Sequence, residues 1–202
     1  AQVHAAIAAA VDRFGGIDIL INNASAISLT GTLDTPMKRF DLMHQINTRG
    51  TFLCTQKAVP HLTKSANPHV LNISPPVYST LSPRWFGPTV AYTMAKYGMS
   101  LCALGMAEEF RPLGIAVNAL WPRTAIDTEA IRLIAGPEAR KKKRSPAIMA
   151  DAAYWILTQP SRKVTGRFFL DDEVLRNAGV SDFSRYRQPG VREEDLMADF
   201  FL

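Results

Sequence analysis

The chain of 202 residues is long enough for one domain with a hydrophobic core, and contents of 47% hydrophobic and 20% charged residues exclude a disordered or fibrous protein. The net charge of +5 comes largely from the run of residues 140–144, which lacks interleaved aromatic residues, so we expect a solvated loop and no nucleic-acid partner. The two cysteines lack metal-ligand spacing, so we expect no metal site. There is no apolar stretch of about 18 residues and no signal peptide, which predicts a cytoplasmic protein without a membrane span.

The first third of the chain predicts a helix, a strand and a second, longer helix. Apolar residues at helical spacing occupy residues 2–14, and two glycines end the pattern. Residues 17–22 form a short apolar run, which is typical of a strand buried on both faces. Residues 37–62 then predict one long helix.

The rest of the chain repeats this alternation. Strands are predicted over residues 69–74, 115–120 and 167–170, and helices over residues 89–110 and 148–157. Successive strands separated by helices require parallel pairing with right-handed crossovers. The fold class is therefore α/β: one domain with a Rossmann-type parallel sheet flanked by helices. Ligands of such sheets bind beyond the carboxyl ends of the strands, so chemistry is sought there.

Two polar motifs occur early in this order. Asn22-Asn23-Ala24-Ser25 follows the first strand, and its amides suit either a polar turn or a backbone that passes close to a flat ligand. Asn47 and Gly50 interrupt the long helix although both are poor helix formers. This interruption indicates a kink or a functional amide, and the residues alone favour neither.

Tyr92 and Lys96 are spaced i, i+4 in the helix predicted over residues 89–110. They therefore share one helix face, where the ammonium can lower the pKa of the phenol and fit it for proton transfer to a carbonyl oxygen. Chance alone yields on the order of 0.2 such pairs in this composition, so the spacing by itself is weak evidence.

The order of the motifs is more specific than any one of them. The chain has Asn-Asn-Ala-Ser after a strand, Asn-Thr-Arg-Gly on a helix, Asn-Ile-Ser after a strand, Tyr-x-x-x-Lys on a helix and Trp-Pro after a strand. This series resembles the short-chain dehydrogenase/reductase family over residues 1–175, and several stretches resemble its hydroxysteroid dehydrogenase-like branch, which is linked to lipid metabolism.

The resemblance implies catalytic roles for four residues. Tyr92 is the general acid/base, and Lys96 lowers its pKa and binds the nicotinamide ribose. Asn47 holds a water that links Lys96 to solvent. Ser74 is the candidate for polarising the substrate oxygen; Ser79, counted back from Tyr92, is the alternative, and a simple turn serine is a third interpretation.

The resemblance also implies a cofactor, NADP or NAD, with NADP favoured. Asn23 and Ala24 lie along it, and Pro122, Ile126 and Thr128 contact its nicotinamide end together with Tyr92 and Lys96. One departure affects this end, because an arginine at position 123 replaces the glycine of the family's Pro-Gly.

A further departure concerns the family's opening β-α-β-α-β unit, with its Gly-rich phosphate loop, which this chain lacks. We expect a fragment of a longer protein, whose sheet would expose an apolar edge.

The expected function is an NAD(P)-dependent oxidoreductase that acts on a hydrophobic carbonyl or alcohol, either lipid-like or steroid-like, and assembles as a homo-oligomer; peroxisomal or mitochondrial placement fits a eukaryotic source. The alternative is an inactive fragment or lipid-binding protein that retains the motifs. Apolar residues after residue 79 and in 124–147 indicate an apolar ligand, and Phe200 and Phe201 suit either a cover for an apolar cleft or a docking tail.

Overall fold

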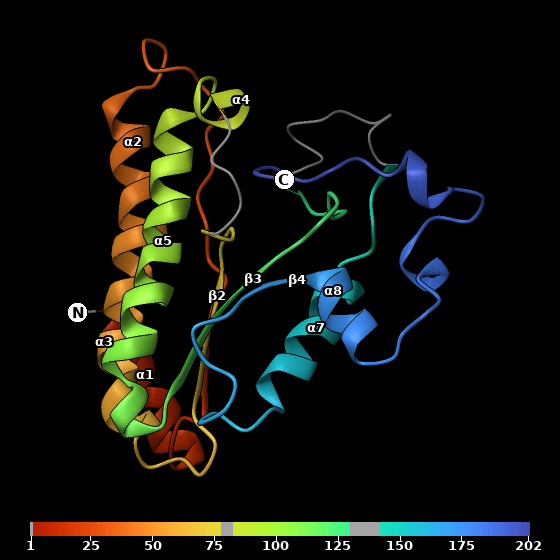
Figure 1. The fold of residues 1–202 in the computed structure, drawn as a ribbon. Helices are drawn as coiled ribbons and strands as arrows, with labels where there is room; N and C mark the ends of the chain where they lie inside the picture. Colours follow the sequence, from red (N-terminus) through yellow and green to blue (C-terminus); the bar gives the residue numbers. More distant parts are fainter. Residues whose placement is uncertain (1, 78–82, 130–141) are drawn as a thin grey trace.

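The computed structural model of the protein describes residues 2–77, 83–129 and 142–202, and its centre is one parallel sheet (Figure 1). The strands are β1 (Ile19–Asn22), β2 (His69–Ile73), β3 (Ala116–Trp121) and β4 (Phe168–Leu170). They lie in the order β1-β2-β3-β4, and every neighbouring pair is parallel. The predicted Rossmann-type parallel sheet is thereby confirmed.

Burial differs between the strands in a way that follows their place in the sheet. All six residues of β3 are buried, as its continuous apolar sequence predicts. The prediction of burial on both faces is wrong for β1, where Ile19 and Ile21 are 45% and 46% exposed. Within the described residues β1 is an edge strand, so the structure contains the apolar edge expected of a sheet without the opening unit.

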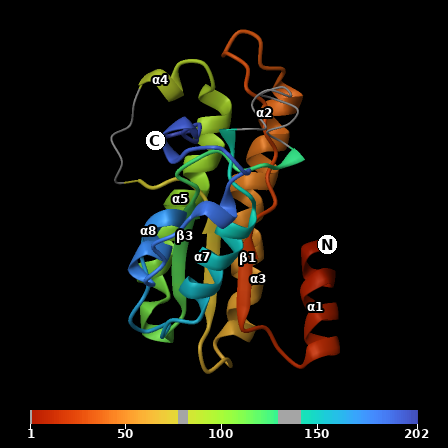
Figure 2. The same ribbon diagram turned by 90° about the vertical axis from the view of Figure 1, so that its right-hand side faces the viewer.

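Helices cover both faces of the sheet and make a three-layer structure (Figures 1 and 2). One side carries α1 (Gln2–Phe14), α2 (Met37–His44), α3 (Gly50–Leu62) and α5 (Val90–Glu109). The other side carries α7 (Ala147–Leu157) and α8 (Asp171–Asn177). None of the helices in the described ranges has the length and apolarity that crossing a bilayer demands.

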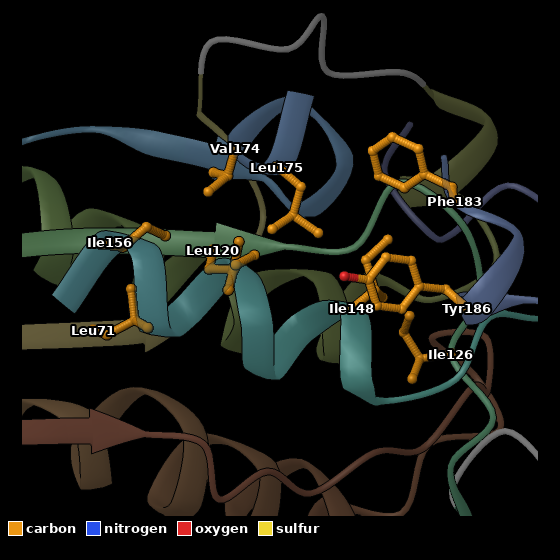
Figure 3. Packing of buried hydrophobic residues seen from close by; sticks show 10 residues of the cluster. Leu71, Leu120, Ile126, Ile148, Ile156, Val174, Leu175, Phe183 and Tyr186 are labelled. Atoms are coloured by element: carbon orange, nitrogen blue, oxygen red, sulfur yellow. The ribbon is translucent and has the colours of Figure 1, made fainter. Parts of the chain in front are cut away.

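Each side of the sheet has its own hydrophobic core. Because side chains alternate along a strand, Val70 of β2 packs toward α3 and α5, whereas Leu71 packs toward α7. Figure 3 shows the second of these cores, in which Leu71 and Leu120 of the sheet meet Ile148 and Ile156 of α7. Burying each such side chain stabilises the fold by about 1.5–3 kcal/mol, so these contacts hold the strand ends in place.

The predicted long helix over residues 37–62 is interrupted where its poor helix formers lie. Between α2 and α3 the chain forms a π-helical turn, η1 (Gln45–Arg49), with Asn47 at its centre. Single π-turns inside α-helices are frequently found at functional sites. The interruption is thus a local change of helix geometry.

Three features differ from the sequence predictions or were not anticipated. Helix α8 follows β4 directly and was missed because it is short; its opening Asp-Asp-Glu was the available signal. The short helix α4 (Pro83–Phe86) was missed for the same reason. The basic run is not simply a solvated loop: Lys143 and Arg144 are buried, and Arg144 pairs with Glu193.

Candidate active site

A cavity of about 530 Å³ lies at the carboxyl ends of β1, β2 and β3, the place where ligands bind in open parallel sheets. Its walls are formed by Asn23, Ser25, Ile27, Ile73, Tyr92, Lys96, Trp121, Pro122, Ile126, Thr128, Pro146, Met149, Ala150, Asp199 and Phe200. Segments that are distant in the sequence therefore contribute to one cavity.

Most of the predicted site residues line this cavity. Six of them, predicted from separate segments of the chain, meet here: Asn23, Tyr92, Lys96, Pro122, Ile126 and Thr128. Ala24, Asn47 and Ser74 are not among its lining residues. Six of the nine predicted residues therefore line one cavity, and the other three do not.

Helix α5 positions the Tyr92–Lys96 pair, whose members are 6% and 2% exposed. Helical spacing places both side chains on the face that packs against the strand ends. The Lys96 ammonium donates a hydrogen bond to the Ile73 carbonyl oxygen at 2.7 Å. It also lies 5.1 Å from the centre of the Trp121 ring. Lys96 is therefore anchored at the end of β2 and held by an aromatic face.

The electrostatics of the pair differ from the sequence expectation. Burial raises the pKa of Tyr92 above its usual range, and the nearby carboxylate of Asp199 raises it further. Burial lowers the pKa of Lys96 to about 8, and the Asp199 charge opposes that shift. The pKa of Tyr92 is thus raised in this arrangement, with desolvation of the phenolate as the first cause and the Asp199 charge as the second.

Asn47 fixes the loop that follows β1. Its side-chain oxygen accepts a hydrogen bond from the Ala26 N–H, and its amide group donates to the Ala26 carbonyl, both at 2.9 Å. Asn47 itself is fully buried. The side chain thus holds η1 to the segment carrying Asn23 through one accepted and one donated hydrogen bond.

Side-chain amides connect the strands that carry the site. Asn22 on β1 donates from its side chain to the Asn72 oxygen on β2 at 2.8 Å and to Thr55 at 3.2 Å. Asn72 in turn donates to the Met99 carbonyl of α5 at 3.2 Å. This buried network connects the sheet to α5 and keeps the Tyr92–Lys96 pair in register with the strand ends.

Ser74 lies at the end of β2 and is 1% exposed. Within the described residues its hydroxyl oxygen has no hydrogen-bond partner. Its neighbour Ile73 lines the cavity, whereas Ser74 does not. The alternative, Ser79, falls outside the described residues, as do the apolar side chains of residues 131–134.

The main contribution that sequence reasoning missed comes from the C-terminal tail, residues 196–202. Asp199 and Phe200 line the cavity, and the Phe201 ring is stacked on Tyr92 with 6.1 Å between ring centres. The aromatic pair was the only signal, and it fits both earlier interpretations: the tail docks and it covers an apolar cleft. Nothing in the sequence pointed to Asp199.

The lining of the cavity fits the nicotinamide end of a cofactor. The described residues contain no cluster of histidine, cysteine, aspartate and glutamate able to hold a metal ion. Polar Asn23, Ser25 and Thr128 share the cavity with apolar Ile126 and Pro122, a mixture that fits a flat ring with a polar substituent.

Comparison with known proteins agrees with this geometry. A family profile described as "Enoyl-(Acyl carrier protein) reductase" matches residues 1–172. The chain is 56% identical to hydroxysteroid dehydrogenase-like protein 2 of Danio rerio over all 202 residues, which are 47% of that protein. The chain therefore spans about half the length of the curated relatives it matches.

Solved structures show the same fold. A putative dehydrogenase from Xanthomonas campestris is 55% identical, with a TM-score of 0.92 over 100% of this chain and 72% of that one. A short-chain dehydrogenase from Mycobacterium thermoresistibile is 49% identical, with a TM-score of 0.89 over 99% of this chain and 70% of that one. The chain belongs to the short-chain dehydrogenase/reductase family of oxidoreductases.

Proposed function

We propose that the full-length protein transfers hydride between a nicotinamide cofactor and a hydrophobic carbonyl or alcohol, with Tyr92 as general acid/base. The observation that carries this proposal is the placement of Tyr92 and Lys96, side by side on α5, in the cavity at the strand ends. The cavity holds both a proton donor and a flat, partly polar surface for the cofactor.

The residues of the chain have separate roles in this reaction. NADP, or NAD, supplies or accepts the hydride when bound, with Asn23, Pro122, Ile126 and Thr128 along its nicotinamide end. Tyr92 gives its phenolic proton to the carbonyl oxygen, which becomes the alcohol oxygen. Because burial raises the pKa of Tyr92, the phenol is protonated at neutral pH, and this favours the direction of carbonyl reduction.

The substrate class follows from the cavity wall. Its large apolar members come from five segments of the chain: Ile27, Ile73, Trp121, Ile126, Met149 and Phe200. Binding to such a wall is driven by burial of apolar surface, and the charged side chains in the wall are Lys96 and Asp199. We therefore propose a lipid-like or steroid-like ketone or secondary alcohol, a class that agrees with the names of the curated relatives.

Nucleotide binding provides the first experimental check. NADPH and NADH should each be titrated against the full-length protein while nicotinamide fluorescence is followed. We expect binding, tighter for NADPH, together with NADPH-dependent reduction of 2-decanone. If neither nucleotide binds, the alternative of an inactive, lipid-binding protein is correct.

Ser74 provides a second prediction. A buried hydroxyl without a partner costs stability, and a substrate oxygen would satisfy it. We propose that Ser74 polarises this oxygen. Ser74→Ala should lower kcat/KM by about 10²-fold, the effect of losing one oxyanion donor, without lowering the melting temperature. Ser79→Ala is the matched comparison, and a larger loss in that variant would identify Ser79 as the polarising residue instead.

The proposed homo-oligomer would use apolar side chains exposed on α3 and α5. Phe52, Met94 and Leu101 are 51%, 50% and 61% exposed, on two helices that pack against each other on one side of the sheet (Figure 1). A second copy of the chain is the occupant we propose for this face. Leu101→Glu should shift the full-length protein toward monomers in sedimentation velocity; an unchanged distribution would place the interface elsewhere.

A further inference from the structure

The C-terminal tail is fastened to the active site by backbone hydrogen bonds. It runs antiparallel to the segment after β3, with an isolated bridge between Thr124 and Ala198. The Asp199 N–H donates to the Arg123 carbonyl at 3.1 Å. The Trp121 indole N–H donates to the Phe200 carbonyl at 2.9 Å. These bonds flank Asp199 on both sides, so its position is set by the fold.

Asp199 is a buried carboxylate inside the cavity. It is 6% exposed and lines the same wall as Tyr92 and Lys96. Its carboxyl group accepts a hydrogen bond from the Phe200 N–H, and burial raises its pKa to about 7. Its charge acts on both members of the catalytic pair. The cavity thus contains a third ionisable group, and this group comes from the far end of the chain.

Lys96 needs a counter-charge that its other contacts do not supply. Its ammonium touches a carbonyl oxygen, the Met99 sulfur at 3.5 Å and an aromatic ring, all of which are neutral. A buried ammonium without an opposite charge is strongly destabilised. In the described part of the chain the carboxylate that acts on Lys96 is Asp199.

Other charged groups near Asp199 do not take over this role. Asp171 of α8 is also negative and adds to the potential at Asp199. The Arg123 side chain, on the segment paired with the tail, is bound to Asp172 and Glu173. The ionisable groups that act with Asp199 are therefore Lys96 and Tyr92 from α5 and Asp171 from α8. The Arg123 guanidinium, which lies next to the tail, is already neutralised by its own carboxylates.

We propose that Asp199 is a positioning residue of the active site, whose carboxylate stabilises the Lys96 ammonium and disfavours the Tyr92 phenolate, so that alcohol oxidation requires a higher pH. This inference rests on the proposed function. It does not follow from family membership, because Asp199 lies beyond residues 1–172, the part that matches the family profile. A negative charge near a phenol disfavours the phenolate, and the same charge stabilises an ammonium.

The test compares Asp199→Asn with wild type in the full-length protein. Asparagine keeps the size of the side chain and can still accept the Phe200 N–H, but it removes the charge. With 2-decanol and NADP as substrates, the acidic limb of the kcat/KM profile should move to lower pH by about one unit, because the phenolate then forms more readily. Reduction of 2-decanone at neutral pH should stay close to wild type, because burial by itself keeps the Tyr92 phenol protonated there.

Four further variants make the result specific. Asp195→Asn removes a charge next to the tail, but Asp195 is partly exposed, pairs with Arg192 and does not line the cavity, so the pH profile of this variant should match wild type. Asp199→Glu keeps the charge, so its pH profile should lie close to that of wild type. If Asp199→Asn does not fold, Asp199→Ser removes the charge with a smaller side chain. An ultraviolet titration of Asp199→Asn, from which the titration of Asp199→Asn/Tyr92→Phe is subtracted, reports the ionisation of Tyr92 without any substrate. The Tyr92 pKa obtained in this way should be lower than the value obtained from wild type and Tyr92→Phe.

The outcomes separate this inference from the proposed function. If Tyr92→Phe is inactive but the Asp199→Asn profile equals wild type, the inference is wrong and the proposed function stands. If Asp199→Asn only tightens nucleotide binding and leaves the profile unchanged, the tail merely obstructs the cavity and the inference is again wrong. If Tyr92→Phe keeps full activity, the proposed function itself fails.

Discussion

Replacing Tyr92 by Phe is expected to lower kcat/KM for carbonyl reduction by about 10²–10⁴-fold, the usual contribution of a general acid. The substitution removes the transferable proton but keeps the ring, which is stacked on Phe201 in the cavity wall. The fold should therefore persist, and circular dichroism and the melting temperature should stay close to wild type. The decisive measurement is the rate of NADPH oxidation by the full-length protein with 2-decanone.

A matched control is available on the opposite side of the sheet. Tyr154 lies on α7 and is 72% exposed, so Tyr154→Phe removes the same hydroxyl from a surface position. Its activity should equal wild type. If both variants behave alike, Tyr92 is not the acid, and proton transfer must be sought at another group.

Replacing Gly98 by Ala is expected to destabilise the protein by about 1–3 kcal/mol, the usual cost of overpacking a core. A Cβ atom at position 98 would lie 2.8 Å from Thr48 Cγ2 and 3.1 Å from Thr48 Cβ, and it would also collide with Thr48 Oγ1. Because Thr is branched at Cβ, rotation about χ1 cannot clear both branches, and it would break the 3.0 Å bond from Thr48 Oγ1 to the Ala95 carbonyl.

The same helix supplies the control for Gly98. A Cβ atom at exposed Gly105 would meet nothing within 4 Å, so Gly105→Ala should gain up to about 1 kcal/mol from better helix propensity. Urea denaturation of both variants measures the difference. Thr48→Ala should rescue Gly98→Ala in a double-mutant cycle. Equal stability of the two single variants would show that η1 does not pack tightly on α5.

Activity should follow the loss of packing at Gly98. Thr48 belongs to η1, the same π-turn that carries Asn47, and Asn47 clamps the loop bearing Asn23. Displacing η1 from α5 therefore moves a cavity wall as well as a helix. We expect Gly98→Ala to weaken nucleotide binding even at temperatures where the protein stays folded.

Much of the site could be predicted because each of its motifs is local. Tyr92 and Lys96 share a helix face through their spacing, and Asn23, Pro122 and Ile126 follow predicted strands whose carboxyl ends meet at one edge of the sheet. The interruption at Asn47 and Gly50 was also readable, since two poor helix formers within one helix signal a departure from regular geometry.

The sequence by itself therefore determined the order of strands and helices, the parallel sheet and the position of the Tyr92–Lys96 pair, because hydrophobic period and motif order are properties of neighbouring residues. Only the tertiary structure decided the electrostatics of the site. The Lys96 ammonium is directed to the Ile73 carbonyl, burial raises the Tyr92 pKa, and Asp199 reaches the same cavity although it lies 103 residues beyond Lys96 in the sequence. Desolvation and long-range contacts depend on how distant segments pack, and no local pattern records them.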